Sequence, residues 1–279
     1  MTLDNRRSTL QEQSLPLISC LCVTRNKPEQ LKTAVNCFHA QTYPNRELLI
    51  IFEEDDPATR TWVTSLDDKD IRYVEVPAIP KLSLGILRNL SVDEAKGEYF
   101  CQWDDDDWYH EERLTAQYEA ILMNHKQASF LAYWFMYDHI RNRSFMSHLG
   151  PWPGTIMCKK SILSDHIRYS DFSRHEDYAL MAKLTAFNYA FPLVMPYLYI
   201  YSYHGKNTFG QAHFDGLFDR SQAFSPAFTT LFKKIFNNEL SNAEASRILK
   251  GPLLEEIDYF YNTPLPHIQS DEETWNPVW

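Results

Sequence analysis

Four consecutive aspartates, Asp104 to Asp107, are the residues of this chain whose type and spacing most clearly indicate chemistry. They follow an apolar, strand-like stretch at residues 99–103 and precede Trp108 and Tyr109. Like charges this close repel one another unless water solvates them or a cation neutralises them. Carboxylate oxygens at this density suit Mg²⁺, Mn²⁺ or Ca²⁺. A solvated acidic turn is the simpler interpretation of an isolated acidic run, but the strand and the aromatic neighbours favour a cation site.

A second pair of acids, Glu176 and Asp177, lies at the start of a stretch with helical periodicity, residues 175–188. The positive end of a helix dipole keeps a carboxylate ionised. An ionised carboxylate in a cleft is able to remove a proton from a reacting hydroxyl group. Taken alone, the pair is equally typical of an ordinary helix N-terminus.

The elements that must position these acids alternate between strand and helix patterns through about the first two hundred residues. This alternation predicts βαβ units and a mostly parallel sheet, whose carboxyl edge is where ligands bind. Residues 138–153 resemble a loop, the pattern beyond residue 210 is helical without strands (for example 227–249), and the tail from Thr263 is expected to be loosely ordered. The expected strands are 17–23, 48–52, 71–76, 99–103, 130–137 and 155–158, and the expected helices are 28–40, 58–66, 84–95, 111–125 and 175–188.

The composition is that of a globular protein with a packed core. The chain has 279 residues, 44% of them hydrophobic and 23% charged, with a net charge of −10. This charge argues against duplex nucleic acid as a partner, since such binding requires a basic face. The five cysteines lie mostly in apolar runs without zinc-ligand spacing, so we expect reduced core residues. Residues 1–16 lack a signal-peptide core, and the longest apolar stretch, 190–203, is too short to cross a bilayer. We therefore expect a cytoplasmic protein.

The order of motifs resembles that of the inverting glycosyltransferases of family two, which have a GT-A fold. Five landmarks of that family have a counterpart within residues 17–210. A lone acidic motif is weak evidence, but five motifs in order are specific. They are VTRNKPEQL (23–31), similar to the family's P-T-Y-N-R-x-x-x-L; QTYPNREL (41–48), similar to Q-T-Y-x-x-x-E; LRN (87–89) with AKGEY (95–99), similar to R-N…A-x-G-E-Y; the aspartates 104–107, similar to the DxD-type metal motif; and Glu176-Asp177, similar to the E-D that carries the catalytic base.

The resemblance implies a role for individual residues. Asp106 is implied as the direct ligand of Mn²⁺ or Mg²⁺, with Asp104 and His204 as further metal ligands and Lys206 assisting at the phosphates. Asp177 is implied as the general base, with Trp152, Gly154 and Glu176 on the acceptor side. The residues implied to bind the nucleotide sugar are Thr24, Arg25, Asn26, Glu54, Asp55, Arg88, Asp104 and Asp105.

Two positions depart from the family pattern. The second strand of the family usually ends in D-D-G-S, whereas residues 53–56 here are EEDD. By alignment Glu54 replaces the acid that contacts the uracil ring, and a shift of one residue would give this role to Asp55. Arg25 stands where the family commonly has tyrosine. Arg88 is implied to support the base-binding acid, and an ordinary surface arginine is the alternative.

These observations predict one α/β domain of GT-A type over residues 17–210, after a flexible segment (1–16) and before a C-terminal helical extension and tail (211–279). The expected function is metal-dependent, inverting transfer of a sugar from a nucleotide-linked donor, with UDP as the expected nucleotide, to a glycan or lipid-linked acceptor in cell-surface polysaccharide or lipopolysaccharide synthesis. Peripheral contact with the inner face of a membrane is compatible with this function. A nucleotidyltransferase is the alternative enzyme, although residues 23–31 lack the glycine-rich loop it would need. A non-catalytic acidic module that binds cations or glycans is the other alternative.

Overall fold

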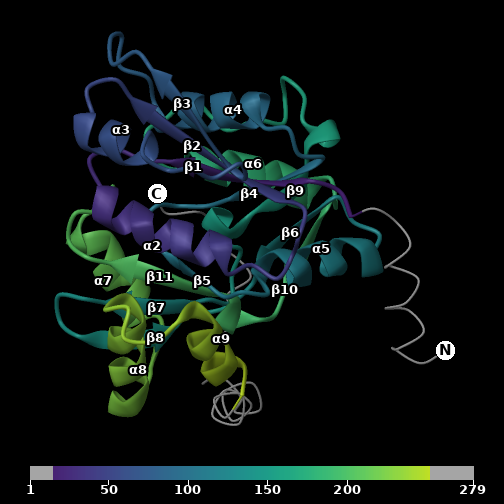
Figure 1. Cartoon of the computed structure of the whole chain (residues 1–279). Helices are drawn as coiled ribbons and strands as arrows, with labels where there is room; N and C mark the ends of the chain where they lie inside the picture. Colours follow the sequence, from purple (N-terminus) through teal and green to yellow (C-terminus); the bar gives the residue numbers. More distant parts are fainter. Residues whose placement is uncertain (1–14, 252–279) are drawn as a thin grey trace.

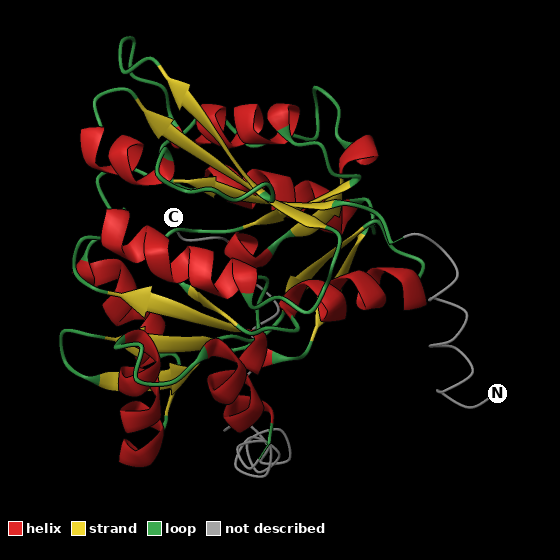
Figure 2. Cartoon of the chain, viewed as in Figure 1, coloured by secondary structure: helices red, strands yellow, loops and turns green. Residues whose placement is uncertain are grey.

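The computed structural model describes residues 15–251 and confirms an α/β fold with a central sheet flanked by helices (Figures 1 and 2). The central sheet has seven strands in the order β10-β6-β9-β4-β1-β2-β3. All pairs are parallel except those of β9, which runs antiparallel to β4 and β6. Its strands are β1 (Ile18–Val23), β2 (Arg46–Glu53), β3 (Ile71–Val76), β4 (Tyr99–Gln102), β6 (Ala128–Leu131), β9 (Met157–Lys159) and β10 (Ala190–Leu193).

Helices cover both faces of this sheet. Helices α4 and α6 pack on one face, and α2 and α5 pack on the other. Of these, α2 lies between the central sheet and a second sheet (Figure 1). Burial on both faces explains why β1 and β2 are almost continuously apolar. The helices of the described residues are α2 (Pro28–His39), α3 (Pro57–Val63), α4 (Leu84–Glu94), α5 (Arg113–Met123), α6 (Glu176–Ala186), α7 (Gln211–Asp219), α8 (Pro226–Phe236) and α9 (Asn242–Lys250).

A second sheet of five strands, which the sequence patterns did not predict, lies beside α2. Its order is β12-β8-β7-β11-β5, and its pairs are antiparallel except β7 with β11. It consists of β5 (Trp108–Tyr109), β7 (Phe135–Asp138), β8 (Arg143–Met146), β11 (Tyr199–Tyr203) and β12 (Gln222–Ala223). Short 3-10 turns, η1 (Pro153–Thr155), η2 (Lys160–Ile162) and η3 (Pro196–Leu198), join the two sheets to their loops.

Three expectations drawn from the sequence patterns are wrong. Residues 130–137 form two strands, because the chain leaves the central sheet after Leu131 and enters the second sheet at Phe135. Residues 138–153, expected to form a loop, contain strand β8. Residues 227–249 are mostly helical, as expected, and form most of α8 and α9. The described residues after 210, which end at 251, were expected to contain no strand but include β12, which pairs with β8.

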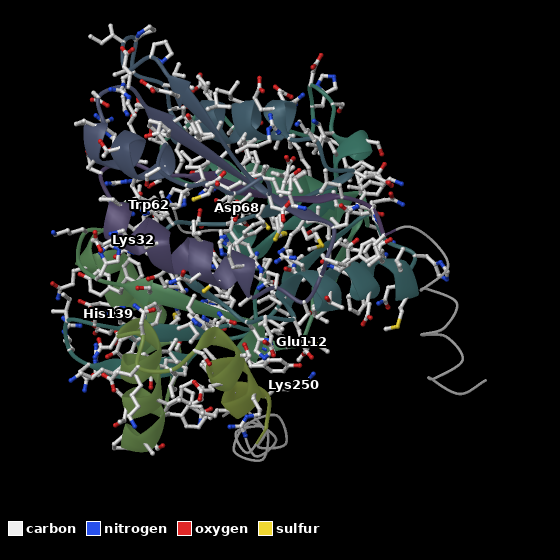
Figure 3. All side chains as sticks on the ribbon, in the orientation of Figure 1. Lys32, Trp62, Asp68, Glu112, His139 and Lys250 are labelled. Carbon is white, nitrogen blue, oxygen red and sulfur yellow. The ribbon has the colours of Figure 1, made fainter. Side chains whose placement is uncertain are left out.

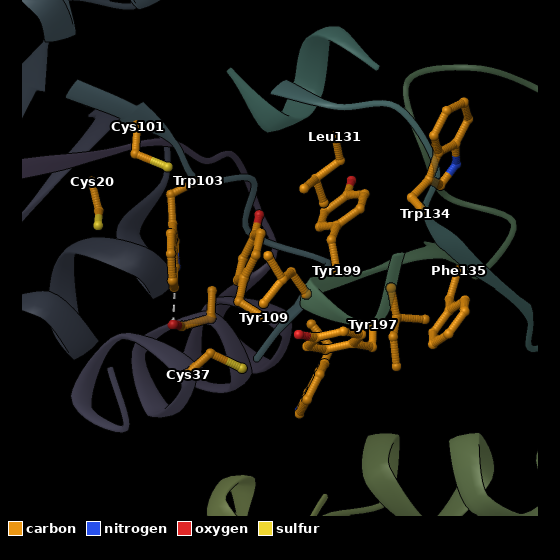
Figure 4. Packing of buried hydrophobic residues seen from close by; sticks show 14 of the residues in the cluster. Cys20, Cys37, Cys101, Trp103, Tyr109, Leu131, Trp134, Phe135, Tyr197 and Tyr199 are labelled. Atoms are coloured by element: carbon orange, nitrogen blue, oxygen red, sulfur yellow. Dashed lines mark hydrogen bonds between the residues drawn. The ribbon is translucent and has the colours of Figure 1, made fainter. Parts of the chain in front are cut away.

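Aromatic packing beneath the carboxyl edge of the sheet fixes the end of β4. Trp103 is fully buried, stacks on Tyr109 at 3.9 Å between ring centroids, and donates from Nε1 to the Ala34 carbonyl of α2 at 3.1 Å (Figure 4). The buried guanidinium of Arg113 lies 4.6 Å from the centroid of Tyr109 and 5.2 Å from that of Trp103. The segment that follows β4, which contains the aspartates, therefore begins at a tightly packed position.

The described part of the C-terminal region packs onto this unit. The imidazole of the buried His110 contacts the Ser246 carbonyl of α9 at 3.1 Å. Lys250 and Glu112 lie side by side in Figure 3, and their charged groups approach to 2.7 Å. At the other end, Leu15 and Pro16 each accept a hydrogen bond through the carbonyl, from Asn45 and Tyr43. Residues 1–14 and the tail from Thr263 lie outside the described residues, as does the rest of 252–279.

Candidate functional site

A cavity of about 530 Å³ opens at the carboxyl ends of β1, β2 and β4, where the sheet topology placed the expected site. This volume is in the range of pockets that bury a small ligand. The four aspartates line one side, and the first turn of α6 and residues 151–154 line another. Strands from the first half of the chain and loops from the second half thus meet around one space.

The four aspartates have different surroundings, so they cannot share one role. Asp104 accepts from Arg88 at 2.9 Å, and Asp105 accepts from Thr24 at 2.6 Å. Asp106 lies within 3.0 Å of the His204 imidazole. Asp107 is buried and accepts from the Tyr199 hydroxyl and from the Ser202 amide.

The charge states of three of these carboxyls differ for physical reasons. Burial, with the neighbouring charge of Asp106, raises the pKa of Asp105 to about 7. Burial alone would raise the pKa of Asp106, but the hydrogen bond from His204 and the charge of Lys27 lower it to about 2. Burial and the adjacent carboxylates raise the pKa of Asp107 well above its ordinary value. Of these three carboxyls, Asp106 is therefore the one best held in its ionised form.

Arg88 links the aspartates to α6. Its Nε donates to Glu176 at 2.8 Å and its Nη2 donates to Asp104 at 2.9 Å, and the residue is only 7% exposed. The alternative of an ordinary surface arginine is therefore wrong. Glu176, expected on the acceptor side, is buried against Arg88 at the edge of the cavity.

Asp177 lines the cavity from the first turn of α6. His175 precedes it in the left-handed region (φ 60°) and turns the chain into the helix. Burial, and then the charge of Glu176, raise the pKa of Asp177 to about 7 despite the opposing charge of Arg88. A carboxyl with a pKa near neutrality is suited to exchanging a proton with a bound hydroxyl group.

The far end of the cavity is formed by a charged trio that sequence reasoning did not identify as such. Glu53, only 2% exposed, accepts from Arg25 at 2.8 Å and also from Lys81, and its Oε1 atom is buried with no partner among the described residues. Of the described residues, all three line the cavity. The signal in the sequence was a glutamate that directly continues the apolar run of β2.

The residues proposed from the family alignment at this position lie elsewhere. Glu54 accepts from the Ala78 amide at 3.2 Å, and Asp55 pairs with Arg25 at 2.7 Å from an exposed position. Neither is among the described residues that line the cavity. Because side chains alternate along a strand, the carboxylate of Glu53 points into the cavity and that of its neighbour Glu54 points away.

The N-terminal motif, residues 23–31, forms a turn next to the aspartates. Asn26 has a positive φ of 55° and donates its amide to Asp56 at 2.6 Å. Lys27 follows, and its ammonium lies 3.2 Å from Asp105 and 2.7 Å from Asp106. The family alignment gave Asn26 a binding role, but Lys27 is the one of the two that lines the cavity.

The donor set for a divalent cation is partly assembled. Asp106 and His204 converge, and carboxylate and imidazole are both suitable ligands for Mn²⁺. Within residues 15–251, no three potential ligands are grouped as a closed metal centre. The set therefore fits a cation that takes its remaining ligands from a diphosphate and water. Lys206 does not line the cavity among the described residues, whereas the neighbouring Asn207 does.

The part of the cavity where the sequence predicts the acceptor is aromatic. Trp152 stacks on the buried Trp134 at 4.6 Å, lies 4.7 Å from Tyr201, and donates from Nε1 to Tyr199 at 3.3 Å. A side chain on Gly154 would place its Cβ 3.2 Å from Trp152 Nε1 and 3.5 Å from Asp104 Oδ2. Glycine therefore keeps open the space between the aromatic platform and the aspartates.

Two further properties of the described residues bear on function. All five cysteines are buried and free, as expected. In residues 15–251 there is no helix with the length and apolar character needed to cross a bilayer.

Comparison with known proteins gives a consistent result. The family model described as Glycosyl transferase family 2 matches residues 19–183, more than half of the chain. The amylovoran biosynthesis glycosyltransferase AmsB of Erwinia amylovora is 24% identical over 213 residues, which cover 67% of this chain and 69% of that protein.

Two solved structures show the same fold. TarS 1–349 of S. aureus, in complex with UDP-GlcNAc, has a TM-score of 0.55 at 14% identity and covers 88% of this chain and 78% of its own. The mannosyltransferase PcManGT of Pyrobaculum calidifontis, in complex with GDP-Man and Mn²⁺, has a TM-score of 0.52 at 14% identity, covering 91% and 81%. These likenesses confirm the expected GT-A fold.

Proposed function

This chain belongs to glycosyl transferase family 2, and from that premise we propose that it is a metal-dependent, inverting enzyme. It transfers a sugar from a UDP-linked donor to a glycan or lipid-linked acceptor. The observation that carries this proposal is the shared cavity, which presents Asp104 to Asp106 on one side and Asp177 on another. Transfer needs both groups, because one side holds the diphosphate and the other receives the proton of the acceptor.

The charged trio supports uracil as the base. Uracil presents two carbonyl oxygens on either side of one N–H group. Arg25, Glu53 and Lys81 present a donor, an acceptor and a donor in the same cavity. The unpartnered Oε1 atom of Glu53 is available for the uracil N–H, and filling it would remove the cost of a buried polar atom without a hydrogen bond. Guanine, by contrast, presents two adjacent donors on this edge.

The donor diphosphate is placed against the aspartates. Asp106 and His204 are proposed to hold the divalent cation, and Thr24 and Arg88 keep Asp105 and Asp104 in position. The bound cation stabilises the negative charge that develops on the leaving diphosphate. Buried Asp107 instead ties the cluster to β11 through Tyr199 and Ser202.

Asp177 is proposed to act on the acceptor. The acceptor oxygen forms a bond to the anomeric carbon, while the bond from that carbon to the diphosphate breaks and its electrons leave with the diphosphate. The proton of the acceptor hydroxyl passes to Asp177. Attack opposite the leaving group inverts the configuration of the anomeric carbon, and no covalent intermediate with the enzyme is needed.

The acceptor is proposed to be a growing glycan or its lipid-linked form. Trp152 and Tyr201 provide flat apolar surfaces that suit the C–H faces of a sugar ring. The relative AmsB is named for the biosynthesis of amylovoran, which supports a role in polysaccharide synthesis. We propose a cytoplasmic location, and a lipid-linked acceptor would place the enzyme at the inner face of a membrane.

A panel of nucleotides tests the donor assignment. Purified protein is heated with UDP, GDP, CDP or ADP, each with Mn²⁺, and the midpoint of unfolding is measured. A ligand that binds the native state raises this midpoint, so UDP should give the largest rise. A larger shift with GDP than with UDP would overturn the uracil assignment and leave the sugar-transfer assignment open to a different donor.

A further inference from the structure

Asp106, the carboxylate expected to bind a metal ion directly, is already paired with a cationic side chain of this protein. The Lys27 ammonium donates to Asp105 Oδ1 at 3.2 Å and to Asp106 Oδ2 at 2.7 Å. The side chain is 22% exposed, so it lies largely within the cavity and not in solvent. A positive charge of the protein therefore neutralises the acidic cluster from the inside.

The local backbone holds Lys27 in this position. Asn26 adopts a positive φ, which asparagine tolerates better than most residues, and its amide is bonded to Asp56. Pro28 then begins α2 and restricts the backbone of the residue before it. With both neighbouring residues fixed, the Lys27 side chain extends from the turn toward the aspartates. The local backbone therefore fixes this ion pair, in contrast to the ion pair of an unconstrained lysine at the surface.

The arrangement leaves Asp106 with little capacity for another cation. Its Oδ2 atom already has Lys27 at 2.7 Å, His204 at 3.0 Å and the Asn207 amide at 3.4 Å. A divalent ion bound there would lie beside the ammonium, and the two positive charges would repel one another. The ammonium must move away before Asp106 can act as a metal ligand.

We propose that Lys27 is a built-in competitor of the divalent cation and a carrier of charge to the donor. In the free enzyme its ammonium occupies the position between Asp105 and Asp106 and keeps the affinity for the cation low. When the nucleotide sugar binds, the diphosphate accepts the displaced ammonium and the cation takes Asp106. This second half rests on the proposed function. Cation and donor therefore bind synergistically, and the coupling acts equally in both directions.

Removal of the ammonium tests the competition. Mn²⁺ affinity is measured by calorimetry and by electron paramagnetic resonance, without nucleotide and with saturating UDP, for native protein and Lys27→Met. Without nucleotide, Lys27→Met should bind Mn²⁺ at least tenfold more tightly than native protein. The gain in Mn²⁺ affinity caused by UDP should shrink by a similar factor. Lys27→Arg, which keeps the charge, should remain close to native.

Lys32→Met is the matched control. Lys32 lies on α2, the helix that Lys27 precedes, and its ion pair with Glu29 is exposed, so the variant loses the same charge without touching the aspartates. Its Mn²⁺ affinity should equal that of native protein. An increase in Lys32→Met as large as that in Lys27→Met would show a general charge effect and overturn the proposal. Unchanged or weaker Mn²⁺ binding by Lys27→Met would also overturn it.

A measurement on native protein covers the case in which Lys27→Met does not fold. Nitrogen-15 resonances of lysine ammonium groups report hydrogen-bonded Lys27, and UDP with diamagnetic Mg²⁺ should shift its signal. A Lys27 signal that is unchanged at saturation would overturn the proposal. The two proposals can fail separately. If no variant binds UDP but Lys27→Met gains Mn²⁺ affinity, the proposed function fails, whereas the competition by Lys27 stands.

Discussion

The role of each aspartate follows from its neighbours and not from its place in the run of four. Asp106 combines a lowered pKa with an imidazole neighbour, whereas buried Asp107 is tied to β11 by Tyr199 and Ser202. Asp106→Ala should therefore abolish the dependence of UDP binding on Mn²⁺. Calorimetry of native and variant protein, each with Mn²⁺ and with chelator, measures this dependence. Equal UDP affinity of native protein with metal and with chelator would contradict the metal assignment.

Neighbouring glutamates at the end of β2 provide a sharper test of the base pocket. Glu53→Gln should weaken UDP binding by roughly tenfold, about 1.4 kcal/mol, because it replaces the acceptor that faces the uracil N–H. Glu54→Gln is the matched control, since it makes the same chemical change on a side chain that points away from the cavity. Titration calorimetry with UDP decides between them. A larger loss in Glu54→Gln than in Glu53→Gln would restore the alignment-based assignment.

The raised pKa of Asp177 has a consequence for the pH dependence of transfer. The carboxyl faces Glu176, Arg88 and Asp104, and burial with the charge of Glu176 raises its pKa to about 7. A base works only when deprotonated, so the single-turnover rate should rise as the pH increases through about 7. In Asp177→Asn this acidic limb should disappear. A native rate that is flat between pH 5 and 8 would argue against Asp177 as the base.

At the scale of elements, Asp56 couples a helix to the binding turn. It caps α3 by accepting from the Thr59 amide, and it also accepts from the Asn26 amide. Asp56→Ala should lower the free energy of unfolding by about 1–2 kcal/mol through the lost cap and should also weaken UDP binding. Ser225→Ala, which removes the cap of the distant α8, is the control and should lower stability alone. Chemical denaturation and UDP titration of both variants separate the two effects.

The elements also show what could be predicted from the sequence. The apolar runs were sufficient to predict β1, β2 and β4, because these central strands are buried along almost their whole length. The parallel edge strand β10 was not predicted, since it is short, contains Pro192 and is only partly buried. The second sheet was missed because β8 and β12 are short and pair with distant segments. Local periodicity does not show with which other segment a strand pairs. The inward orientation of Glu53 was missed for a related reason. Whether Glu53 or Glu54 points into the cavity depends on the residue at which β2 ends, and the sequence pattern does not fix that residue.

The Lys27 ammonium could not be assigned from sequence. Its position depends on the turn at Asn26, on the bond from that residue to Asp56, and on the distance from β1 to β4. The aspartate cluster and Asp177 could be identified from the sequence, because the family pattern that the chain resembles has acids at the same two places, the end of a strand and the start of a helix. Contacts between β1 and the aspartates appear only when the chain is folded.

At the scale of the whole molecule, the cavity combines parts from distant regions of the chain. Residues before 110 supply the nucleotide end and the aspartates, and residues after 150 supply Trp152 and Asp177 to the lining, with His204 against Asp106. Arg88 joins the two regions through Asp104 and Glu176. This division is what the proposed two-substrate transfer requires, because donor and acceptor would meet between the two regions.

The central claim is that Asp177 removes the acceptor proton during sugar transfer. The most direct test is single-turnover transfer from a UDP-sugar with Mn²⁺, measured for native protein and Asp177→Asn alongside UDP affinity. We predict that transfer falls by roughly 10²-fold or more in the variant, about 3 kcal/mol in barrier, while UDP affinity barely changes. Transfer by Asp177→Asn at a near-native rate would contradict the base assignment and the inverting mechanism that depends on it.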